Sequence, residues 1–190
     1  MLPLIAIPVG LIGILTGAAL ATGRRGLTML PVTASSPIKG VVLVRWTRFT
    51  TTMGRHPKGF KSSRGRMGAF GLDGRRLADV GFMTKAKKTT VGGETGVWVG
   101  EWKKPLSEEL YLKSLPIQYA SFKRSMTTMV PKVQGFVGTK VDGKTCTLSG
   151  LLGVGHLAGE SGVASWVKEP RVRAKFAKTT EAFNLVNGIF

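Results

Sequence analysis

The sequence predicts a mainly helical α+β body that carries a small β hairpin and follows an N-terminal hydrophobic helix. Three observations predict this class. The first 23 residues hold no charged side chain, and glycines alternate with aromatic or β-branched residues within residues 92–102, as in a hairpin. Several later segments begin with a capping residue and end at glycine, as helices do. A chain of 190 residues has room for one compact domain and an appendage.

Residues 1–23 are mostly apolar and long enough to cross a bilayer as a helix, because about 20 residues span its hydrocarbon core. A membrane-inserting helix is the first interpretation. The alternatives are a buried or tube-lining helix and a cleaved signal, for which residues 19–21 supply a small-x-small pattern. Arg24 and Arg25 follow this segment, so the positive-inside rule places the body on the cytoplasmic side of the membrane.

Residues 24–40 form the predicted linker, because prolines, serines and a glycine occur there without periodicity. The predicted body comprises residues 41–190. It begins with Val41–Phe49, which is rich in β-branched and aromatic residues and is either a strand or the first helix. The following segment, residues 54–66, mixes basic side chains with three glycines and a proline, so a loop is expected.

Cap and stop signals predict two helices in the middle of the body. Asp73 begins a short helix that Gly81 ends, since Asp caps helix N-termini and Gly favours their C-termini. Ser107, followed by two glutamates, begins another helix. Pro116 interrupts this helix, and an apolar face continues toward Pro131. The residues predicted on that face are Ile117, Ala120, Met126 and Met129.

A glycine-rich helix and a last amphipathic helix complete the predicted body. Thr147 or Ser149 caps the glycine-rich helix and Gly159 ends it, while the last helix spans Arg173 to Val186. Small residues let the backbone of a neighbour approach closely, so the turn at residues 65–71 is predicted to pack against the glycine-rich helix. The leucines predicted in this part of the core are Leu151, Leu152 and Leu157.

The chain is strongly basic, with 28 Lys or Arg against 10 Asp or Glu and a formal charge of +18. This charge predicts polyanions as partners: nucleic acid, anionic lipid or an anionic cell-wall polymer. Residues 24–72 contain ten Lys or Arg and no carboxylate. A loop in this stretch is the candidate nucleic-acid or anion patch, with a merely solvated basic loop as the alternative. The patch comprises Arg55, Lys58, Lys61, Arg64 and Arg66.

Two runs of residues carry a resemblance to a known family. Gly65–Met83 reads GRMGAFGLDGRRLADVGFM, and it resembles the glycine-arginine turn and following helix of lysozyme-like and lytic-transglycosylase-like phage peptidoglycan hydrolases. Thr147–Gly159 reads TLSGLLGVGHLAG, which is similar to the Ser-Gly-Leu-Leu-x-x-x-His helix near the end of many such domains. The resemblance covers about residues 45–190.

The resemblance implies a lysozyme-like domain in a virion-associated protein that engages or hydrolyses host peptidoglycan during phage entry. The implied location is the phage particle, reaching the host envelope, with membrane association through residues 1–23 as an alternative. Implied partners are peptidoglycan, other virion proteins and further copies of the chain. The implied glycan groove contains Arg66, Met67, Gly68, Phe70, Trp98 and Trp102.

One departure from the family concerns catalysis. In the relatives a glutamate precedes the glycine-arginine turn and protonates the leaving oxygen, yet residues 49–59 contain no Asp or Glu. The weak substitutes are Glu94, Glu101 and Glu160. The alternative function is therefore a catalytically inactive structural component of the tail or virion interior, whose basic surface faces nucleic acid or other virion proteins.

The sequence gives little support for a metal site or a bound cofactor. His56 and His156 are the only histidines, and the helical pair of His156 with Glu160 lacks a third metal ligand. We expect His156 to be a structural residue that bonds a backbone carbonyl. The lone Cys146 allows no internal disulfide, and no nucleotide-binding fingerprint occurs, so no cofactor is expected.

Overall fold

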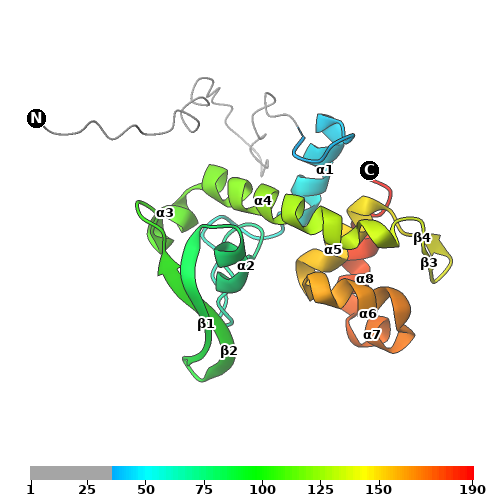
Figure 1. Ribbon diagram of the computed structural model, residues 1–190. Coiled ribbons are helices and arrows are strands. Elements are labelled where there is room, and N and C mark those ends of the chain that lie inside the picture. The colour runs from blue at the N-terminus through cyan, green and yellow to red at the C-terminus, as the bar shows by residue number, and fades with distance from the viewer. Residues whose placement is uncertain (1–35) are drawn as a thin grey trace, which may run out of the picture.

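The computed structural model describes residues 36–190, and it has the predicted mainly helical α+β class with two small antiparallel sheets. Figure 1 shows two lobes joined by the long helix α4, with the β1–β2 hairpin, α2 and α3 at one end and α5 to α8 at the other. The elements are α1 (Leu43–Met53), α2 (Gly74–Asp79), β1 (Met83–Val91), β2 (Glu94–Trp102), α3 (Glu108–Lys113), α4 (Leu115–Val133), η1 (Gln134–Phe136), β3 (Lys140–Val141), β4 (Lys144–Thr145), α5 (Leu148–Ala158), α6 (Glu160–Lys168), α7 (Pro170–Lys175) and α8 (Ala177–Val186).

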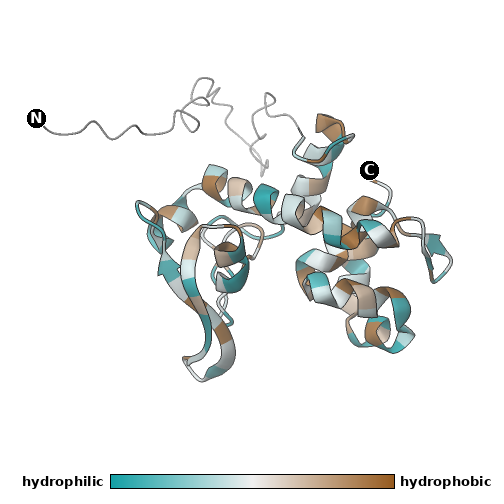
Figure 2. Ribbon diagram, in the orientation of Figure 1, coloured by the Kyte–Doolittle hydropathy of each residue, from teal (hydrophilic) through white to brown (hydrophobic). Residues whose placement is uncertain are grey.

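The predicted hydrophobic helix at residues 1–23 lies outside the described residues, as does most of the predicted linker. Within residues 36–190, no helix combines the length and the apolar character that a membrane span requires. Ile38, at the end of the predicted linker, is buried in the core. Exposed apolar side chains occur where the body begins: Val42 and Val44, beside the start of α1, are 58% and 74% exposed. In Figure 2 the start of α1 has the brown colour of hydrophobic residues.

Helix α1 settles the open interpretation of its segment, which is a helix and not a strand. Its buried residues Trp46, Phe49, Thr50 and Met53 recur at helical spacing, so they form one apolar stripe. That stripe packs on Phe122 of α4, whose ring centroid lies 6.3 Å from that of Trp46 and 6.1 Å from that of Phe49. Helix α1 is thereby fixed to α4, the helix that joins the two lobes.

Helix α4 buries a different face from the one predicted. Met126 and Met129 are buried as expected, but Ile117 is only partly buried and Ala120 is exposed. The buried face includes three polar side chains because α4 contacts loops as well as helices. Its buried residues are Gln118, Ser121, Phe122, Ser125, Met126, Met129 and Val133.

Gln118 of α4 uses its buried amide to hold two loops. Its Oε1 accepts a hydrogen bond from the backbone N–H of Ala69 at 2.8 Å. Its Nε2 donates to the carbonyls of Lys58 and Tyr111, at 2.8 and 2.7 Å. The glycine turn at residues 65–71 and the basic loop before it are therefore both tied to the central helix.

Glycines let α5 pack closely on its neighbours, as the small residues of that helix predicted. A Cβ on Gly153 would lie 2.7 Å from Val186 of α8, and one on Gly155 would lie 2.2 Å from the sulfur of Met129 of α4. Leu151 and Leu152 are fully buried. The prediction for Leu157 was wrong, because this side chain is only partly buried and lines a cleft at the end of the helix.

The predicted caps are formed where the sequence indicated. Asp73 accepts a hydrogen bond from the Arg76 N–H, Ser107 from the Leu110 N–H, and Thr147 from the Gly150 N–H. Pro116 lies in the first turn of α4, where a missing N–H costs nothing, so it begins a helix after α3 has ended. Gly159, with φ of +76°, separates α5 from α6.

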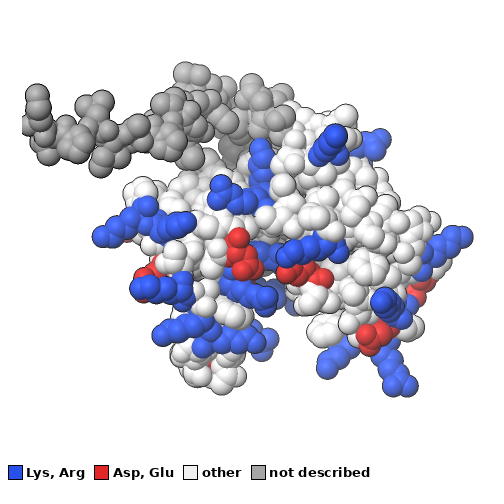
Figure 3. Space-filling model, in the orientation of Figure 1, with Lys and Arg blue, Asp and Glu red and all other residues white. Residues whose placement is uncertain are grey.

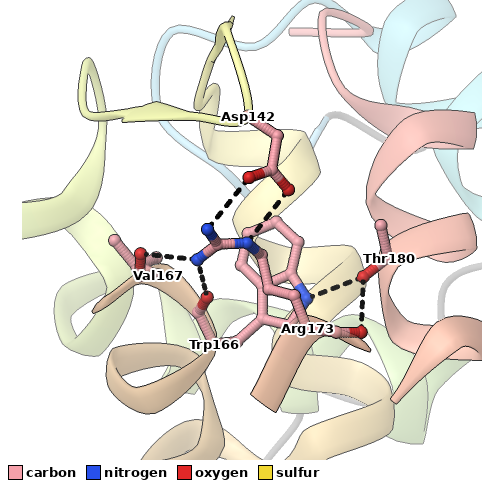
Figure 4. A network of polar contacts seen from close by, with 5 residues as sticks. All are labelled: Asp142, Trp166, Val167, Arg173 and Thr180. Atoms are coloured by element: carbon pink, nitrogen blue, oxygen red, sulfur yellow. Dashed lines mark hydrogen bonds and ion pairs between the residues drawn. The ribbon is translucent and has the colours of Figure 1, made fainter. Parts of the chain in front are cut away.

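The predicted last helix is divided into α7 and α8 at Phe176, and Arg173 of α7 holds the surrounding elements together. Its guanidinium donates to both carboxylate oxygens of Asp142, at 3.0 and 2.9 Å (Figure 4). It also donates to the carbonyls of Trp166 and Val167, at 2.9 and 3.0 Å. This network joins the β3–β4 turn to the end of α6.

Candidate functional site

A cleft of about 260 Å³ lies between the hairpin lobe and the C-terminal helices. In Figure 3 the surface is hollowed between the two lobes, with basic and acidic side chains around the hollow. The lining comes from the end of α1, the basic loop, the glycine turn, α2, β2, the end of α5 and the start of α6. The charged, histidine and aromatic residues among them are Arg55, His56, Arg66, Phe70, Asp73, Arg75, Arg76, Asp79, Trp98, His156 and Glu160.

The glycine turn forms one wall of this cleft. Met67 and Leu72 exchange backbone hydrogen bonds of 2.9 and 3.0 Å across it. Gly68 has φ of +72°, and a Cβ there would lie 2.8 Å from the Gln118 amide. Phe70 of the turn stacks on Phe122 with 4.1 Å between ring centroids. The turn is thus held against α4, and its outer side is left to face the cleft.

Helix α2 brings two arginines into the cleft because it lies directly on β2. A Cβ on Gly74 would lie 2.6 Å from the Trp98 carbonyl, so only glycine permits this approach. The Arg75 guanidinium lies over the Trp98 ring, 5.5 Å from its centroid. Lys88 of β1 lies 5.7 Å from the same ring. Trp98 therefore has two cations beside its π face.

Arg76 is the most enclosed of the four arginines in the cleft. Burial lowers the pKa of its guanidinium, while the nearby Asp73, Asp79 and Glu160 act in the opposite direction. Its Nη2 donates to the Gly155 carbonyl at 3.3 Å, the one side-chain hydrogen bond that Arg76 makes within residues 36–190. In the same part of the chain, no carboxylate oxygen lies within 4.0 Å of its nitrogens.

The three carboxylates of the cleft already have partners or structural roles. Asp73 caps α2, and Asp79 lies 3.9 Å from Arg75. Glu160 forms an ion pair with Lys132, and this hydrogen-bonded contact lowers the pKa of the Glu160 carboxyl. A general acid that works near neutral pH needs a raised pKa. The pKa of Glu160 is lowered instead, so its carboxyl is poorly suited to act as a general acid.

The other two candidate acids lie on the hairpin, away from the cleft lining. Glu94 pairs with Arg64 at 3.5 Å, and Glu101 pairs with Lys85 at 3.0 Å. At the end of α1, where the resemblance implies the catalytic glutamate, the cleft is lined by Met53, Arg55 and His56. Cationic and apolar groups therefore occupy that part of the cleft.

His156 lies at the base of the cleft as a neutral side chain. Burial, followed by the charges of Arg76 and Arg66, lowers its pKa to about 3. Its ring meets Phe122 edge to face at 5.3 Å, and its Nδ1 is buried without a hydrogen-bond partner among the described residues. Within residues 36–190, no group of three or more His, Cys, Asp or Glu is arranged to hold a metal ion.

The structure separates the residues predicted for the glycan groove. Arg66, Phe70 and Trp98 line the cleft. Met67 and Gly68, which belong to the turn itself, are buried, and Trp102 packs on Tyr111, with 5.1 Å between ring centroids. Sequence reasoning missed the cleft residues His56, Arg75, Arg76 and His156, although the two arginines directly follow the turn and its capping residue.

The residues of the predicted anion patch also point to different neighbours. Arg55 lies 3.5 Å from Glu181, Lys61 lies 2.5 Å from Glu108, and Arg64 lies 3.5 Å from Glu94. Lys58 is exposed, and Arg66 and Arg55 line the cleft. The loop is therefore partly neutralised, and its charge is divided between the cleft and the outer surface.

Comparisons with protein-family models, with curated proteins and with solved structures find no match for this chain. The cleft and its chemistry are therefore the basis on which a function is assigned.

Proposed function

We propose that this protein binds peptidoglycan strands in the cleft between its lobes and does not cleave them by general-acid catalysis. One observation carries the proposal: arginines line the cleft, and each carboxylate there caps a helix or lies beside a cation. The proposed setting is a phage particle that meets the host envelope, as the resemblance of residues 45–190 implies.

The chemistry of the cleft suits a polar polymer. Trp98 lines the cleft together with Arg75, whose guanidinium lies over its ring; aromatic rings pack on the apolar faces of sugar rings, and a sugar would contact the part of the indole that faces the cleft. Arg55, Arg66 and Arg75 lie around the same opening and supply several N–H donors each.

The charges argue against glycosidic cleavage. Both the retaining and the inverting mechanisms require a protonated carboxylic acid beside the leaving oxygen. Glu160, the candidate acid within the cleft, pairs with Lys132 and has a lowered pKa. General-acid catalysis contributes typically 10²-fold to 10⁴-fold, so its loss leaves little turnover.

The test uses the full chain and purified, insoluble peptidoglycan. We expect the protein to sediment with peptidoglycan at high salt and to release no soluble fragments or reducing ends. Trp98→Ala should weaken the sedimentation, whereas Phe176→Ala, which removes an exposed aromatic ring outside the cleft lining, should not. Failure of the wild-type protein to sediment would refute binding. Rapid release of fragments that Glu160→Gln abolishes would establish an enzyme instead.

A structural component that faces nucleic acid is the second candidate function. The observation that favours it is the row of exposed lysines Lys85, Lys87 and Lys88 on β1, since lysines on a surface attract phosphates without regard to sequence. This candidate predicts DNA binding that falls steeply with salt. It also predicts that Trp98→Ala leaves the number of released counterions unchanged, because the lysines and not the cleft would contact the phosphates.

A further inference from the structure

Arg76 is an enclosed cation whose hydrogen-bonding capacity is largely unused. A guanidinium has five N–H donors, yet the side chain of Arg76 makes a single hydrogen bond of 3.3 Å, to the Gly155 carbonyl, among residues 36–190. Buried charges in proteins are normally paired, because their removal from water is costly. Most N–H donors of the Arg76 guanidinium therefore have no acceptor within the described part of the chain.

The neighbours of Arg76 increase this deficit of negative charge. Arg55, Arg66 and Arg75 line the same cleft, so four arginines share it with three carboxylates. Asp73 is engaged as a helix cap and Glu160 with Lys132, and Asp79 lies beside Arg75. His156 and His56 line the same cleft, and burial, together with the charges of Arg76 and Arg66, lowers the pKa of His156. Arg55 and Arg75 have Glu181 and Asp79 as ion-pair partners, whereas no carboxylate oxygen of residues 36–190 lies within 4.0 Å of the side-chain nitrogens of Arg66 or Arg76.

We propose that Arg76, Arg66 and the ring of His156, which all line the cleft and are called its floor below, form a subsite for a carboxylate of the bound polymer. This inference rests on the proposed function, because it names the group of the peptidoglycan strand that the cleft recognises. A planar guanidinium donates two parallel hydrogen bonds to a carboxylate. The cavity of about 260 Å³ has room for a small substituent of the strand.

Peptidoglycan offers this chemistry from two sources. Its stem peptides carry free carboxylates, and muramic acid carries a lactyl carboxylate once the stem peptide has been removed. Both ligands are planar anions attached to a neutral glycan. The experiment therefore includes a separate arm for each source.

The first arm compares two charge-matched variants of the full chain. Arg76→Gln removes the cation from the cleft floor and keeps an amide that can still bond Gly155. Arg171→Gln removes an equal charge from an exposed position on α7, outside the cleft lining. Binding to native peptidoglycan should weaken by about 10-fold or more for Arg76→Gln, since a bidentate charge-assisted pair is lost, and should stay unchanged for Arg171→Gln. Equal losses for both variants would overturn the subsite and indicate a general effect of charge.

The second arm changes the ligand. Peptidoglycan whose carboxylates have been converted to methylamides should bind the wild-type protein about 10-fold more weakly than native peptidoglycan, and it should bind Arg76→Gln as native peptidoglycan does. Glycan strands stripped of their peptides then reveal the source. Arg76-dependent binding to stripped strands shows that the subsite accepts the lactyl carboxylate that stripping exposes, and loss of binding on them assigns the subsite to the stem peptide.

The outcomes separate this inference from the proposed function. If the wild-type protein binds native and methylamidated peptidoglycan equally, the subsite is refuted while peptidoglycan binding stands. If it binds neither, acetate titrated against the protein by NMR decides. Chemical-shift changes of the His156 ring that Arg171→Gln retains and Arg76→Gln lacks support an anion subsite without peptidoglycan binding, and their absence in the wild-type protein refutes it. Should Arg76→Gln fail to fold, Arg76→Lys keeps the charge and loses the fork, so weaker binding by this variant also supports the subsite and unchanged binding refutes it.

Discussion

Arg173 and Arg76 are two enclosed arginines in opposite parts of the molecule, and their surroundings differ in kind. The Arg173 side chain is 11% exposed and donates four hydrogen bonds, two to Asp142 and two to backbone carbonyls. Arg76 donates one, to a single carbonyl. A guanidinium whose donors are used within the protein stabilises the fold, whereas one whose donors are left over has hydrogen bonds to offer a ligand.

Because of this difference, substitutions of Arg173 and of Arg76 should affect different measured properties. Loss of a satisfied charge leaves its former partners unpaired, and this costs stability. Loss of an unsatisfied charge removes a desolvation cost instead. Substitutions in the Arg173 network should therefore change the free energy of unfolding, and those in the cleft should change binding.

The largest effect is expected for Arg173→Met. This substitution keeps much of the apolar stem but leaves the carbonyls of Trp166 and Val167 without their donor. We expect the free energy of unfolding to fall by about 3 kcal/mol. This free energy is measured by chemical denaturation, with tryptophan fluorescence as the signal. Asp142→Asn should cost much less, about 1 kcal/mol or below, because Asp142 is 63% exposed. Equal losses in the two variants would contradict this assignment.

The pH dependence of stability tests whether His156 is enclosed in the cleft. Its folded-state pKa of about 3 lies below the ordinary value of 6.5. As pH falls below about 6.5, the unfolded chain gains a proton at His156 that the folded chain does not bind. Stability should therefore be complete above pH 6.5 and fall with decreasing pH, by at most about 1.4 kcal/mol per pH unit.

The measurement compares denaturation curves between about pH 6.5 and 5.5, above the range in which most carboxylates titrate. His156→Gln should remove most of the slope of stability against pH. His56→Gln is the comparison variant. Partial burial and the charges of Arg66 and Arg55 also lower the pKa of His56, but its side chain is exposed, so it should account for the smaller part of the slope. A slope that survives in His156→Gln and disappears in His56→Gln would show that the wrong histidine had been assigned.

The parts of the fold that depend on neighbouring residues could be predicted from the sequence. The caps at Asp73, Ser107 and Thr147 need a side chain and an N–H three residues later, and all three are formed. The sequence predicts a hairpin within residues 92–102, and the structure has a hairpin there, but that segment supplies only the Gly92-Gly93 turn and the second strand, while the first strand is β1 (Met83–Val91). In each case the sequence contains both partners of the interaction within one short segment.

The parts that depend on distant partners could not be predicted. Gln118 is buried on α4 because it bonds Lys58, 60 residues away, and an apolar pattern cannot indicate such a role. Arg173 meets Asp142 across 31 residues. In the cleft, Arg76 is enclosed because α5 lies beside α2, a placement that no local signal records. The resemblance indicated Arg66 and Trp98, which do line the cleft, but it could not indicate how the charges there are paired.

Arg76→Gln should have a small effect on stability, in contrast to Arg173→Met. Its one hydrogen bond is long, and the substitution relieves the cost of enclosing a charge. We expect the free energy of unfolding to stay within about 0.5 kcal/mol of the wild-type value or to rise. The same denaturation experiment provides the comparison. A loss as large as that of Arg173→Met would mean that Arg76 is structural, and the contrast between the two arginines would fail.

The smallest effect is expected for Glu160→Gln, which tests whether the cleft hides a catalytic acid. Glu160 pairs with Lys132 at the surface, so its loss should cost about 0.5 kcal/mol of stability at neutral pH. The lowered pKa of Glu160 means that this contribution is present above the ordinary value of 4.5 and fades as pH falls through the folded-state pKa. Glu109→Gln is the matched control, because Glu109 also has its pKa lowered by a lysine, Lys113, but lies outside the cleft lining. Neither substitution should change the binding of peptidoglycan by more than about twofold, since the subsite assigned to Arg76 requires a positive charge and not an acid. If peptidoglycan cleavage is detected and disappears in Glu160→Gln but not in Glu109→Gln, Glu160 is the proton donor, and the cleft is an active site whose acid is masked by Lys132 until substrate binds.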